Sequence, residues 1–233
     1  MGLAVAPPRR KIGARWGPEG ARRIQRLLDI LLALVFGLLA LPLILGIMLV
    51  LWWREGGPIF YGSERMRGLT QGFTLWKFRT MRSVDEDSGV SGGDKHARVT
   101  PTGHWLRARR LDELPQLWNI LRGDIGFVGP RPPLREYVER FPELYGEVLK
   151  SRPGVTGLAT LVYHRTEAKL LQATHDSVET DAIYSRRCVP RKAQLDLIYQ
   201  RNRSICFDLK LILRTANGIL HPEPAKKDAG KTG

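Results

Sequence analysis

The stretch LLDILLALVFGLLALPLILGIMLVLWW, residues 27–53, decides how the rest of this chain can be arranged. Its 27 residues contain a single charge, Asp29, close to one end. A helix of this length would be about 40 Å long, whereas the hydrocarbon core of a bilayer is about 30 Å thick. The apolar stretch is too long for a signal peptide, and no small-residue cleavage site follows Trp53. The sequence therefore predicts a membrane helix that is retained.

Two features of this helix bear on its topology. Seven basic residues precede it, with Glu19 as the only acid among them, so the N-terminus is expected in the cytoplasm. Pro42, near the middle, removes one backbone hydrogen bond and collides with the carbonyl of Leu38. The helix can then either cross the bilayer with a bend or dip into one leaflet and return. The residues alone leave both topologies open. The seven basic residues are Arg9, Arg10, Lys11, Arg15, Arg22, Arg23 and Arg26.

The charge of the chain indicates an anionic partner. The 233 residues include 37 Lys and Arg against 23 Asp and Glu, which gives a formal net charge of +14. Nucleic acid, an acidic membrane face and a phosphorylated substrate all fit this charge, and the apolar stretch favours the membrane. Only two cysteines occur, with no metal or redox spacing, so a reducing compartment is the default.

The part after the membrane helix predicts an α+β, helix-rich fold. Short β-prone runs at 59–61 and 73–78 flank a Gly-containing connection, which indicates a small antiparallel ribbon. Residues 83–101 are polar and Gly-rich and predict a long loop. The remaining expected elements are helices at 103–111, 112–123, 134–150 with a break at Pro142, 190–205 and 207–220, and a loop and strand within 151–165. The last two helices are basic and amphipathic, so they either lie in the membrane interface or face the core.

Two adjacent carboxylates, Asp112 and Glu113, stand out within RRLDELPQLWNILRGDIGFVGPRPP, residues 109–133. Such a pair is commonly a helix N-cap with favourable first-turn charge, and Asp112 is placed to cap the helix that ends at Gly123. Arginines at 107, 109, 110 and 131 offer cations that could grip phosphate oxygens. Two carboxylates that bring Mg²⁺ to a diphosphate, beside such cations, are typical of phosphoryl transfer. Both interpretations stay open at this point.

The motifs carry a family resemblance. The segment LDELPQLWNILRGDIGFVGPRP, with GPIFYGSERMRG and LWKFRTM before it and RPGVTGLA after it, resembles the bacterial sugar transferase family. Its members are monotopic phosphoglycosyl transferases that load a sugar-1-phosphate onto polyprenyl phosphate. The similarity extends from about Arg23 to Leu220 with four motifs in order.

The resemblance implies roles for individual residues. Asp112 would attack the β-phosphate of a nucleotide sugar and form a covalent phosphosugar intermediate. Glu113 would bind Mg²⁺ or assist the acceptor, with the metal role favoured. Asp112 is also a candidate Mg²⁺ ligand. Substrate binding is expected from residues near the phosphates and the nucleotide: Arg107, Arg131, Pro130, Pro132 and, as weaker candidates, Lys77 and Arg79.

The resemblance also implies a topology and a set of partners. The family's membrane helix is re-entrant and kinked at a proline that Pro42 matches, although Leu41 stands where relatives commonly have serine. We expect a basic segment at 1–22, a re-entrant helix at 23–54, a cytoplasmic catalytic domain at 55–221 and a disordered tail at 222–233. The expected location is the cytoplasmic face of the bacterial inner membrane. Expected partners are a nucleotide sugar (UDP-linked), polyprenyl phosphate and membrane lipids, with no nucleic acid, and a homodimer is left open. The alternative function is a noncatalytic membrane adaptor that binds anionic lipid or nucleic acid.

Overall fold

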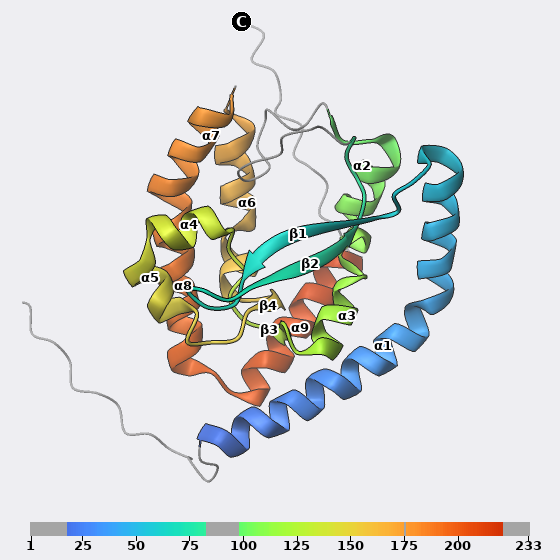
Figure 1. The fold of residues 1–233 in the computed structure, drawn as a ribbon. Helices are drawn as coiled ribbons and strands as arrows, with labels where there is room; N and C mark the ends of the chain where they lie inside the picture. The colour runs from blue at the N-terminus through green and yellow to red at the C-terminus, as the bar shows by residue number, and fades with distance from the viewer. Residues whose placement is uncertain (1–17, 83–97, 175, 221–233) are drawn as a thin grey trace, which may run out of the picture.

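In the computed structural model, one long helix wraps around a body of shorter helices and two small sheets (Figure 1). The structure describes residues 18–82, 98–174 and 176–220. Most of the predicted basic segment and most of the predicted long loop lie outside these residues, and so does the whole predicted C-terminal tail. The helices are α1 (Pro18–Glu55), α2 (Pro101–Ala108), α3 (Gln116–Arg122), α4 (Arg135–Arg140), α5 (Pro142–Val148), α6 (Leu158–Gln172), α7 (Ser177–Ile183), α8 (Val189–Asn202) and α9 (Ile205–Leu220). A 3-10 turn, η2 (Leu111–Glu113), precedes α3, and a π-helical turn, η3 (Tyr184–Cys188), precedes α8.

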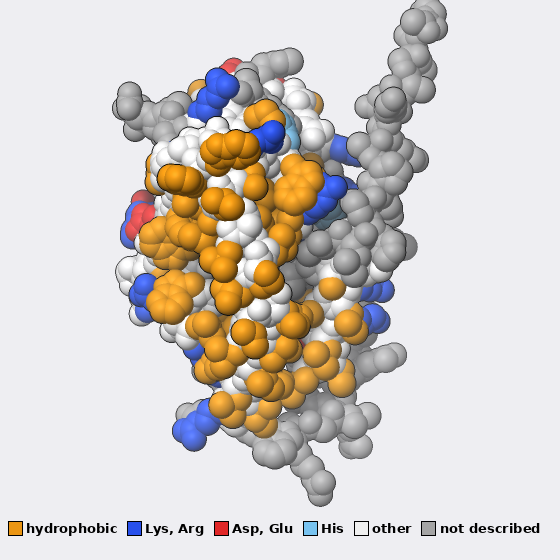
Figure 2. Space-filling view, turned by 90° about the vertical axis from the view of Figure 1, so that its right-hand side faces the viewer, with side chains coloured by type: hydrophobic (Ala, Val, Ile, Leu, Met, Phe, Trp, Pro, Cys, Tyr) orange, Lys and Arg blue, Asp and Glu red, His pale blue; other side chains and the backbone are white. Residues whose placement is uncertain are grey.

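Helix α1 confirms the predicted apolar helix. Among the described residues, Arg23–Glu55 is the one segment that is long and apolar enough to cross a membrane. The helix continues through Pro42, and its axis changes direction along its length (Figure 1). Most of its large apolar side chains are exposed, with Trp53 81% exposed at its end. Figure 2 shows hydrophobic side chains gathered over the side of the molecule along which α1 runs.

The first half of α1 is docked by polar contacts on α3 and on β3 (Gly126–Val128). Arg26 donates hydrogen bonds to the carbonyls of Ile120 and Leu121, which belong to the last turn of α3. Asp29, the one charge in the apolar stretch, is buried and accepts a hydrogen bond from the backbone N–H of Phe127 at 3.1 Å. This contact explains why the apolar stretch tolerates a carboxylate.

The second half of α1 packs against a different part of the same body. Ile47 and Leu51 are buried in a cluster with Phe78 and Leu106, which belong to the ribbon and to α2. Both halves of α1 therefore contact the domain that follows it in the sequence.

The predicted ribbon is confirmed. Strands β1 (Phe60–Met66) and β2 (Gly72–Phe78) pair antiparallel, with Phe60 opposite Phe78 and Met66 opposite Gly72. Asn119 of α3 is fully buried behind the ribbon, where its side chain accepts from the Trp76 N–H and donates to the Thr74 carbonyl. The ribbon is thereby fixed to α3, which follows the acidic pair.

Two segments differ from the sequence prediction. Residues 126–128, for which no strand was predicted, form β3, which pairs in parallel with β4 (Gly154–Thr156). The strand expected within 151–165 is limited to β4, and the chain then continues as α6, whose Ala159 and Leu171 are buried. The tertiary contacts of these inward side chains outweigh the β propensity of the segment.

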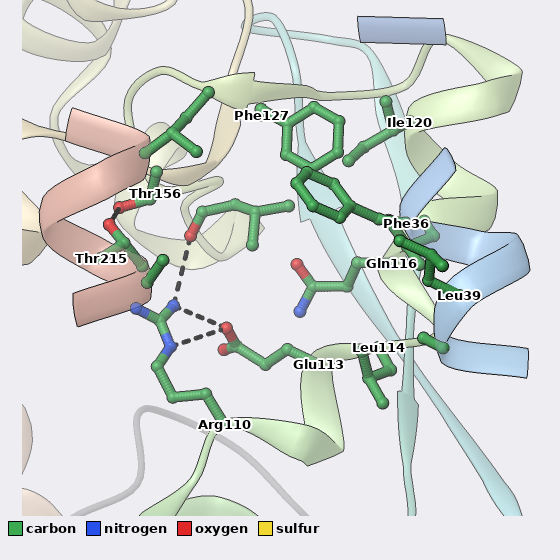
Figure 3. Close-up of a pocket in the computed structure, with 15 residues that line it drawn as sticks. Phe36, Leu39, Arg110, Glu113, Leu114, Gln116, Ile120, Phe127, Thr156 and Thr215 are labelled. Carbon is green, nitrogen blue, oxygen red and sulfur yellow. Dashed lines mark hydrogen bonds and ion pairs between the residues drawn. The ribbon is translucent and has the colours of Figure 1, made fainter. Parts of the chain in front are cut away.

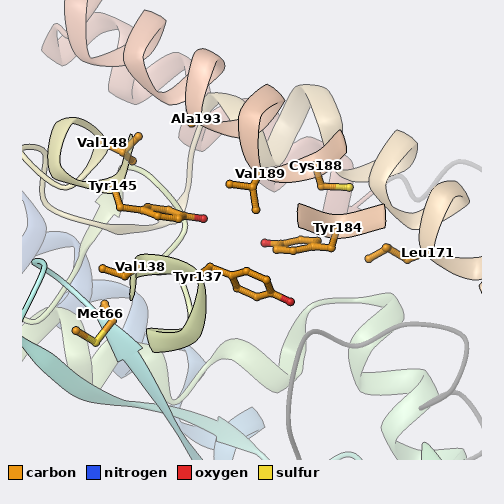
Figure 4. Packing of buried hydrophobic residues seen from close by; sticks show 10 residues of the cluster. All are labelled: Met66, Tyr137, Val138, Tyr145, Val148, Leu171, Tyr184, Cys188, Val189 and Ala193. Carbon is orange, nitrogen blue, oxygen red and sulfur yellow. The ribbon is translucent and has the colours of Figure 1, made fainter. Parts of the chain in front are cut away.

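The main hydrophobic cluster joins β1 to the C-terminal helices (Figure 4). Met66 of β1 packs with side chains of α4, α5, α6, η3 and α8, and the rings of Tyr137 and Tyr184 lie 4.8 Å apart. In α8, Leu195 and Tyr199 are buried, so its apolar face turns mainly to the core. In α9, Leu209 and Leu213 are exposed, and this amphipathic helix presents apolar side chains outward.

Candidate active site

The acidic pair lies in a short, tightly held turn rather than at a helix N-cap. Arg110, just before η2, has φ 54° and ψ 22°, a left-handed conformation that is uncommon outside glycine. Asp112 is 7% exposed, and α3 begins four residues later with Pro115 at its N-cap and no side-chain capping bond. The N-cap prediction for Asp112 is therefore wrong. Left-handed backbone at such a residue costs free energy of order 1 kcal/mol or more and is concentrated at functional sites.

Glu113 is surrounded by three cations, two of which come from distant parts of the chain. Its Oε1 accepts hydrogen bonds from Lys77 Nζ at 3.3 Å and from Arg131 at 3.0 Å. Its Oε2 accepts from two nitrogens of Arg110, at 3.2 and 2.6 Å (Figure 3). Arg110 also donates to the Val155 carbonyl at 3.3 Å, which ties the turn to β4. The carboxylate thus gathers Lys77, Arg110 and Arg131 around one point.

The pKa values of the two carboxylates are shifted in opposite directions. Burial alone would raise the pKa of Glu113, but Arg131, Lys77 and Arg110 together hold that pKa well below its usual range. Burial raises the pKa of Asp112, and the negative charge of Glu113 adds to this, against the attraction of Lys77. Glu113 is therefore a permanent anion that organises cations. Asp112 is the more basic carboxylate, which is the property a nucleophile needs provided that it is ionised.

The contacts of Glu113 do not suit the metal role predicted for it. Mg²⁺ takes oxygen ligands, usually one or two carboxylates with water and substrate phosphates. Both oxygens of Glu113 already accept hydrogen bonds from cationic side chains. A Mg²⁺ ion there would require at least one of these cations to move away. Among the described residues, no group of three or more His, Cys, Asp or Glu side chains is arranged to hold a metal ion.

The Pro-Arg-Pro turn is placed beside the acidic pair by close backbone packing. The Pro130 carbonyl accepts a hydrogen bond from the Gly154 N–H at 2.9 Å, and the Pro132 carbonyl accepts from Arg65 at 3.4 Å. The charge of Glu113 raises the pKa of Arg131 further, so this guanidinium stays positive. The structure brings Arg131 to the site, while both prolines act here through their backbones.

Some of the other predicted substrate-binding residues lie at the acidic pair, and others make structural contacts away from it. Lys77, at the end of β2, reaches Glu113 as described. Arg107 donates to Thr80 Oγ1 at 2.8 Å, and its charge partly opposes the rise in the pKa of Asp112. Arg79 donates three hydrogen bonds to the carbonyls of Glu55, Gly56 and Gly57, where it caps the end of α1. The structure thus does not bring Arg79 to the acidic pair.

A pocket of about 430 Å³ opens beside Glu113 (Figure 3). Ten of its fifteen lining residues are apolar, and they come from α1, α3, α9, the two short strands and Leu114, which lies between η2 and α3. Arg110, Glu113 and Gln116 form its polar end. Sequence reasoning named Arg110 only as a nearby cation and did not single out Gln116. The spacing of Gln116, one turn after Glu113, was the available signal.

Comparisons with known proteins agree with the motifs. The family model described as bacterial sugar transferase matches residues 20–222. The UDP-glucose:undecaprenyl-phosphate glucose-1-phosphate transferase of Escherichia coli (strain K12) is 33% identical over 198 residues, which cover 83% of this chain and 39% of that protein. The exopolysaccharide production protein ExoY of Rhizobium meliloti (strain 1021) is 33% identical over 211 residues, 84% of each chain.

A third relative differs in the sugar that its name gives. The UDP-N-acetylgalactosamine-undecaprenyl-phosphate N-acetylgalactosaminephosphotransferase of Aeromonas hydrophila is 30% identical over 203 residues, 84% of this chain and 44% of that protein. The chain therefore spans about two fifths of the length of the first and third of these relatives. With a family model that covers nearly all of its described residues, the chain belongs to the bacterial sugar transferase family.

Proposed function

We propose that this protein is a monotopic phosphoglycosyl transferase, which moves a sugar-1-phosphate from a UDP-sugar to polyprenyl phosphate. The observation that carries the proposal is the buried Asp112, which stands next to a carboxylate that gathers three cations. Such a cluster can bind and neutralise a diphosphate, and the adjacent carboxylate can attack it. The names of the relatives support a UDP-sugar as donor and undecaprenyl phosphate as acceptor.

In the first proposed step, a carboxylate oxygen of Asp112 attacks the β-phosphorus of the UDP-sugar. The bond from this phosphorus to the bridging oxygen breaks, and UMP leaves with that oxygen and the electron pair. The product on the enzyme is an acyl phosphate that carries the sugar. Lys77, Arg110 and Arg131 are placed by Glu113 to neutralise charge on the phosphates as it shifts towards the leaving group.

In the second proposed step, a phosphate oxygen of polyprenyl phosphate attacks the same phosphorus. Asp112 leaves as a free carboxylate, and the membrane product is a polyprenyl diphosphate sugar. The acyl phosphate is energetic enough for this onward transfer, so no further energy source enters the balance. The Mg²⁺ requirement suggested by the carboxylate pair remains a prediction, and neither step above is written through a metal ion.

Trapping the intermediate tests this mechanism. When the enzyme is incubated with a UDP-sugar labelled at the β-phosphate and without acceptor, we expect label on the protein. Added polyprenyl phosphate should then discharge that label into lipid. A panel of UDP-sugars, including UDP-glucose and UDP-N-acetylgalactosamine, identifies the sugar accepted. Turnover without any label on the protein would show direct transfer between the two substrates and overturn the covalent step.

We also propose that α1 is re-entrant, with the catalytic body on the cytoplasmic face of the bacterial inner membrane. Arg26 and Leu51 are 25 residues apart, about 37 Å along a helix, and both contact the same body. In a straight span across about 30 Å of hydrocarbon, a body on one side could not contact both ends. The bend of α1, which Pro42 would promote by removing a hydrogen bond, is consistent with a helix that returns.

Thiol labelling tests this topology. In a background of Cys188→Ala and Cys206→Ser, we expect Arg23→Cys and Arg54→Cys to react with a membrane-impermeant maleimide from the same side of sealed vesicles. Both parent side chains are exposed, so access is limited by the bilayer alone. Reaction of the two variants from opposite sides would show a spanning helix and contradict the re-entrant proposal.

A further inference from the structure

We propose that the pocket between α1, α3 and α9 is the binding site of the lipid acceptor. Its polar end would hold the phosphate of polyprenyl phosphate at Gln116 and Arg110, and its apolar walls would hold the first isoprene units. This assignment rests on the proposed function, because it names the place from which the acceptor attacks. Its support comes from three features of the pocket: an unsatisfied donor, its walls and its opening.

The unsatisfied donor is the side-chain amide of Gln116. Gln116 is 3% exposed, and its Nε2 has no hydrogen-bond partner among the described residues. Figure 3 shows this amide pointing into the space between the Arg110–Glu113 pair and Phe36. A buried amide without an acceptor is costly, and a native structure keeps one where a ligand or water completes it. A phosphate oxygen is a strong acceptor of the kind that this amide lacks.

The walls of the pocket match an isoprenoid chain better than a nucleotide. Phe36, Leu39 and Ala40 line it from α1, and Ile212 and Ala216 line it from α9. The volume of about 430 Å³ is within the range of small-ligand sites, so it holds the phosphate end of a long lipid and not the whole chain. A UDP-sugar has no extended apolar part that would gain from these walls.

The opening of the pocket connects it to the exposed apolar face of α1. Phe36 and Leu39 line the pocket, yet they are 41% and 71% exposed and belong to the hydrophobic surface of α1. A prenyl chain that leaves the pocket past these side chains meets that apolar face and, with α1 in the bilayer, lipid rather than water. Glu113 at the other end places the phosphate next to the acidic turn. The pocket thus runs from the apolar face of α1 to Glu113, the neighbour in sequence of the proposed nucleophile Asp112.

The kinetic test uses Ala216→Trp, which fills the pocket from α9, and Gln116→Leu, which removes the amide at similar size. We expect each variant to raise the KM for polyprenyl phosphate by about tenfold or more, because Ala216→Trp takes up the space for the prenyl chain and Gln116→Leu loses a hydrogen bond to a charged group. The KM for the UDP-sugar and the labelling of the enzyme without acceptor should stay near the wild-type values. The matched control is Leu213→Trp, on the outward face of α9, which should leave both KM values unchanged.

Two further readouts keep this test separate from folding and from the mechanism. The melting temperature of Gln116→Leu should not fall, because the variant removes an unsatisfied buried donor. In the cysteine-free background, the thiol of Ala216→Cys should be protected by farnesyl phosphate and not by inorganic phosphate, whether or not the enzyme turns over. An unchanged acceptor KM, an equal rise in the donor KM, or no protection by farnesyl phosphate would overturn the assignment. Failure of the covalent mechanism would instead appear as missing label in the wild-type enzyme.

Discussion

Asp112→Asn should lower the rate of sugar-phosphate transfer by roughly 10⁴-fold or more, which is typical for loss of a nucleophile. Asparagine has nearly the same shape, but its neutral amide does not attack phosphorus. Turnover and protein labelling from a β-labelled UDP-sugar should both be lost, while membrane association remains. If the protein were an adaptor that only binds lipid, no sugar-phosphate transfer would depend on this carboxylate.

The same substitution has an unusual expected effect on stability. Burial raises the pKa of Asp112, which means that folding disfavours its ionised form relative to the unfolded chain. Replacing the carboxylate by a neutral amide should therefore leave the melting temperature unchanged or raise it. Loss of activity with retained stability would identify a residue kept for chemistry rather than for folding.

The matched control for Asp112→Asn is Asp176→Asn. Asp176 caps α7 by accepting the Glu179 N–H at 2.7 Å, and asparagine caps a helix about as well as aspartate. This variant should retain wild-type turnover. Near-wild-type transfer by Asp112→Asn would exclude the carboxyl group at position 112 as the attacking group.

Gly154→Ala should destabilise the fold strongly, because the added methyl group would meet backbone atoms. A Cβ at Gly154 would lie 2.3 Å from the backbone nitrogen of Gly129 and 2.5 Å from the carbonyl carbon of Val128. The two short strands would have to separate, and backbone atoms cannot move aside as a flexible side chain can. We expect a loss of about 3 kcal/mol in the free energy of unfolding. This corresponds to a fall in melting temperature of roughly 6–12 °C for a chain of this size.

The matched control carries the same methyl group at Gly146, in the middle of α5. There the nearest atom to an added Cβ would be a Leu69 methyl carbon at 3.8 Å, an ordinary contact. Alanine is favoured over glycine in a helix by roughly 0.5–1 kcal/mol, so Gly146→Ala should raise the melting temperature slightly. The two melting temperatures are measured in the same detergent. If they were equal, the close approach of β3 and β4 would not be the cause of any destabilisation by Gly154→Ala.

The elements that could be predicted from the sequence are those with a local signal. The apolar length of α1, the β-prone runs of the ribbon and the break at Pro142 are each readable within a few turns of chain. The pairing of β3 with β4 could not be read, because each strand has three residues and its partner lies far along the chain. The helical state of α6 depended on burial of side chains such as Leu171, which periodicity did not reveal.

The candidate site also contains residues that the sequence motif identified and contacts that only the structure revealed. The motif identified Asp112, Glu113 and Arg131, and the structure brings Arg131 and Lys77 to Glu113. Arg79, a weaker candidate from the same family resemblance, caps α1 instead. Sequence patterns record which residue types occur together and do not record where a long side chain ends.

By itself, the sequence determined that this chain carries an apolar helix long enough to cross a membrane, a net positive charge and an acidic pair within a family motif, because these properties depend on composition and on neighbours a few positions away. Only the tertiary structure decided that α1 contacts the body with both halves and that Lys77 and Arg131, 36 and 18 residues from Glu113, meet at its carboxylate. It also decided that Gln116 faces an apolar pocket beside that cluster. The physical reason is that burial and charge act through space, so their balance is set only when distant segments pack together.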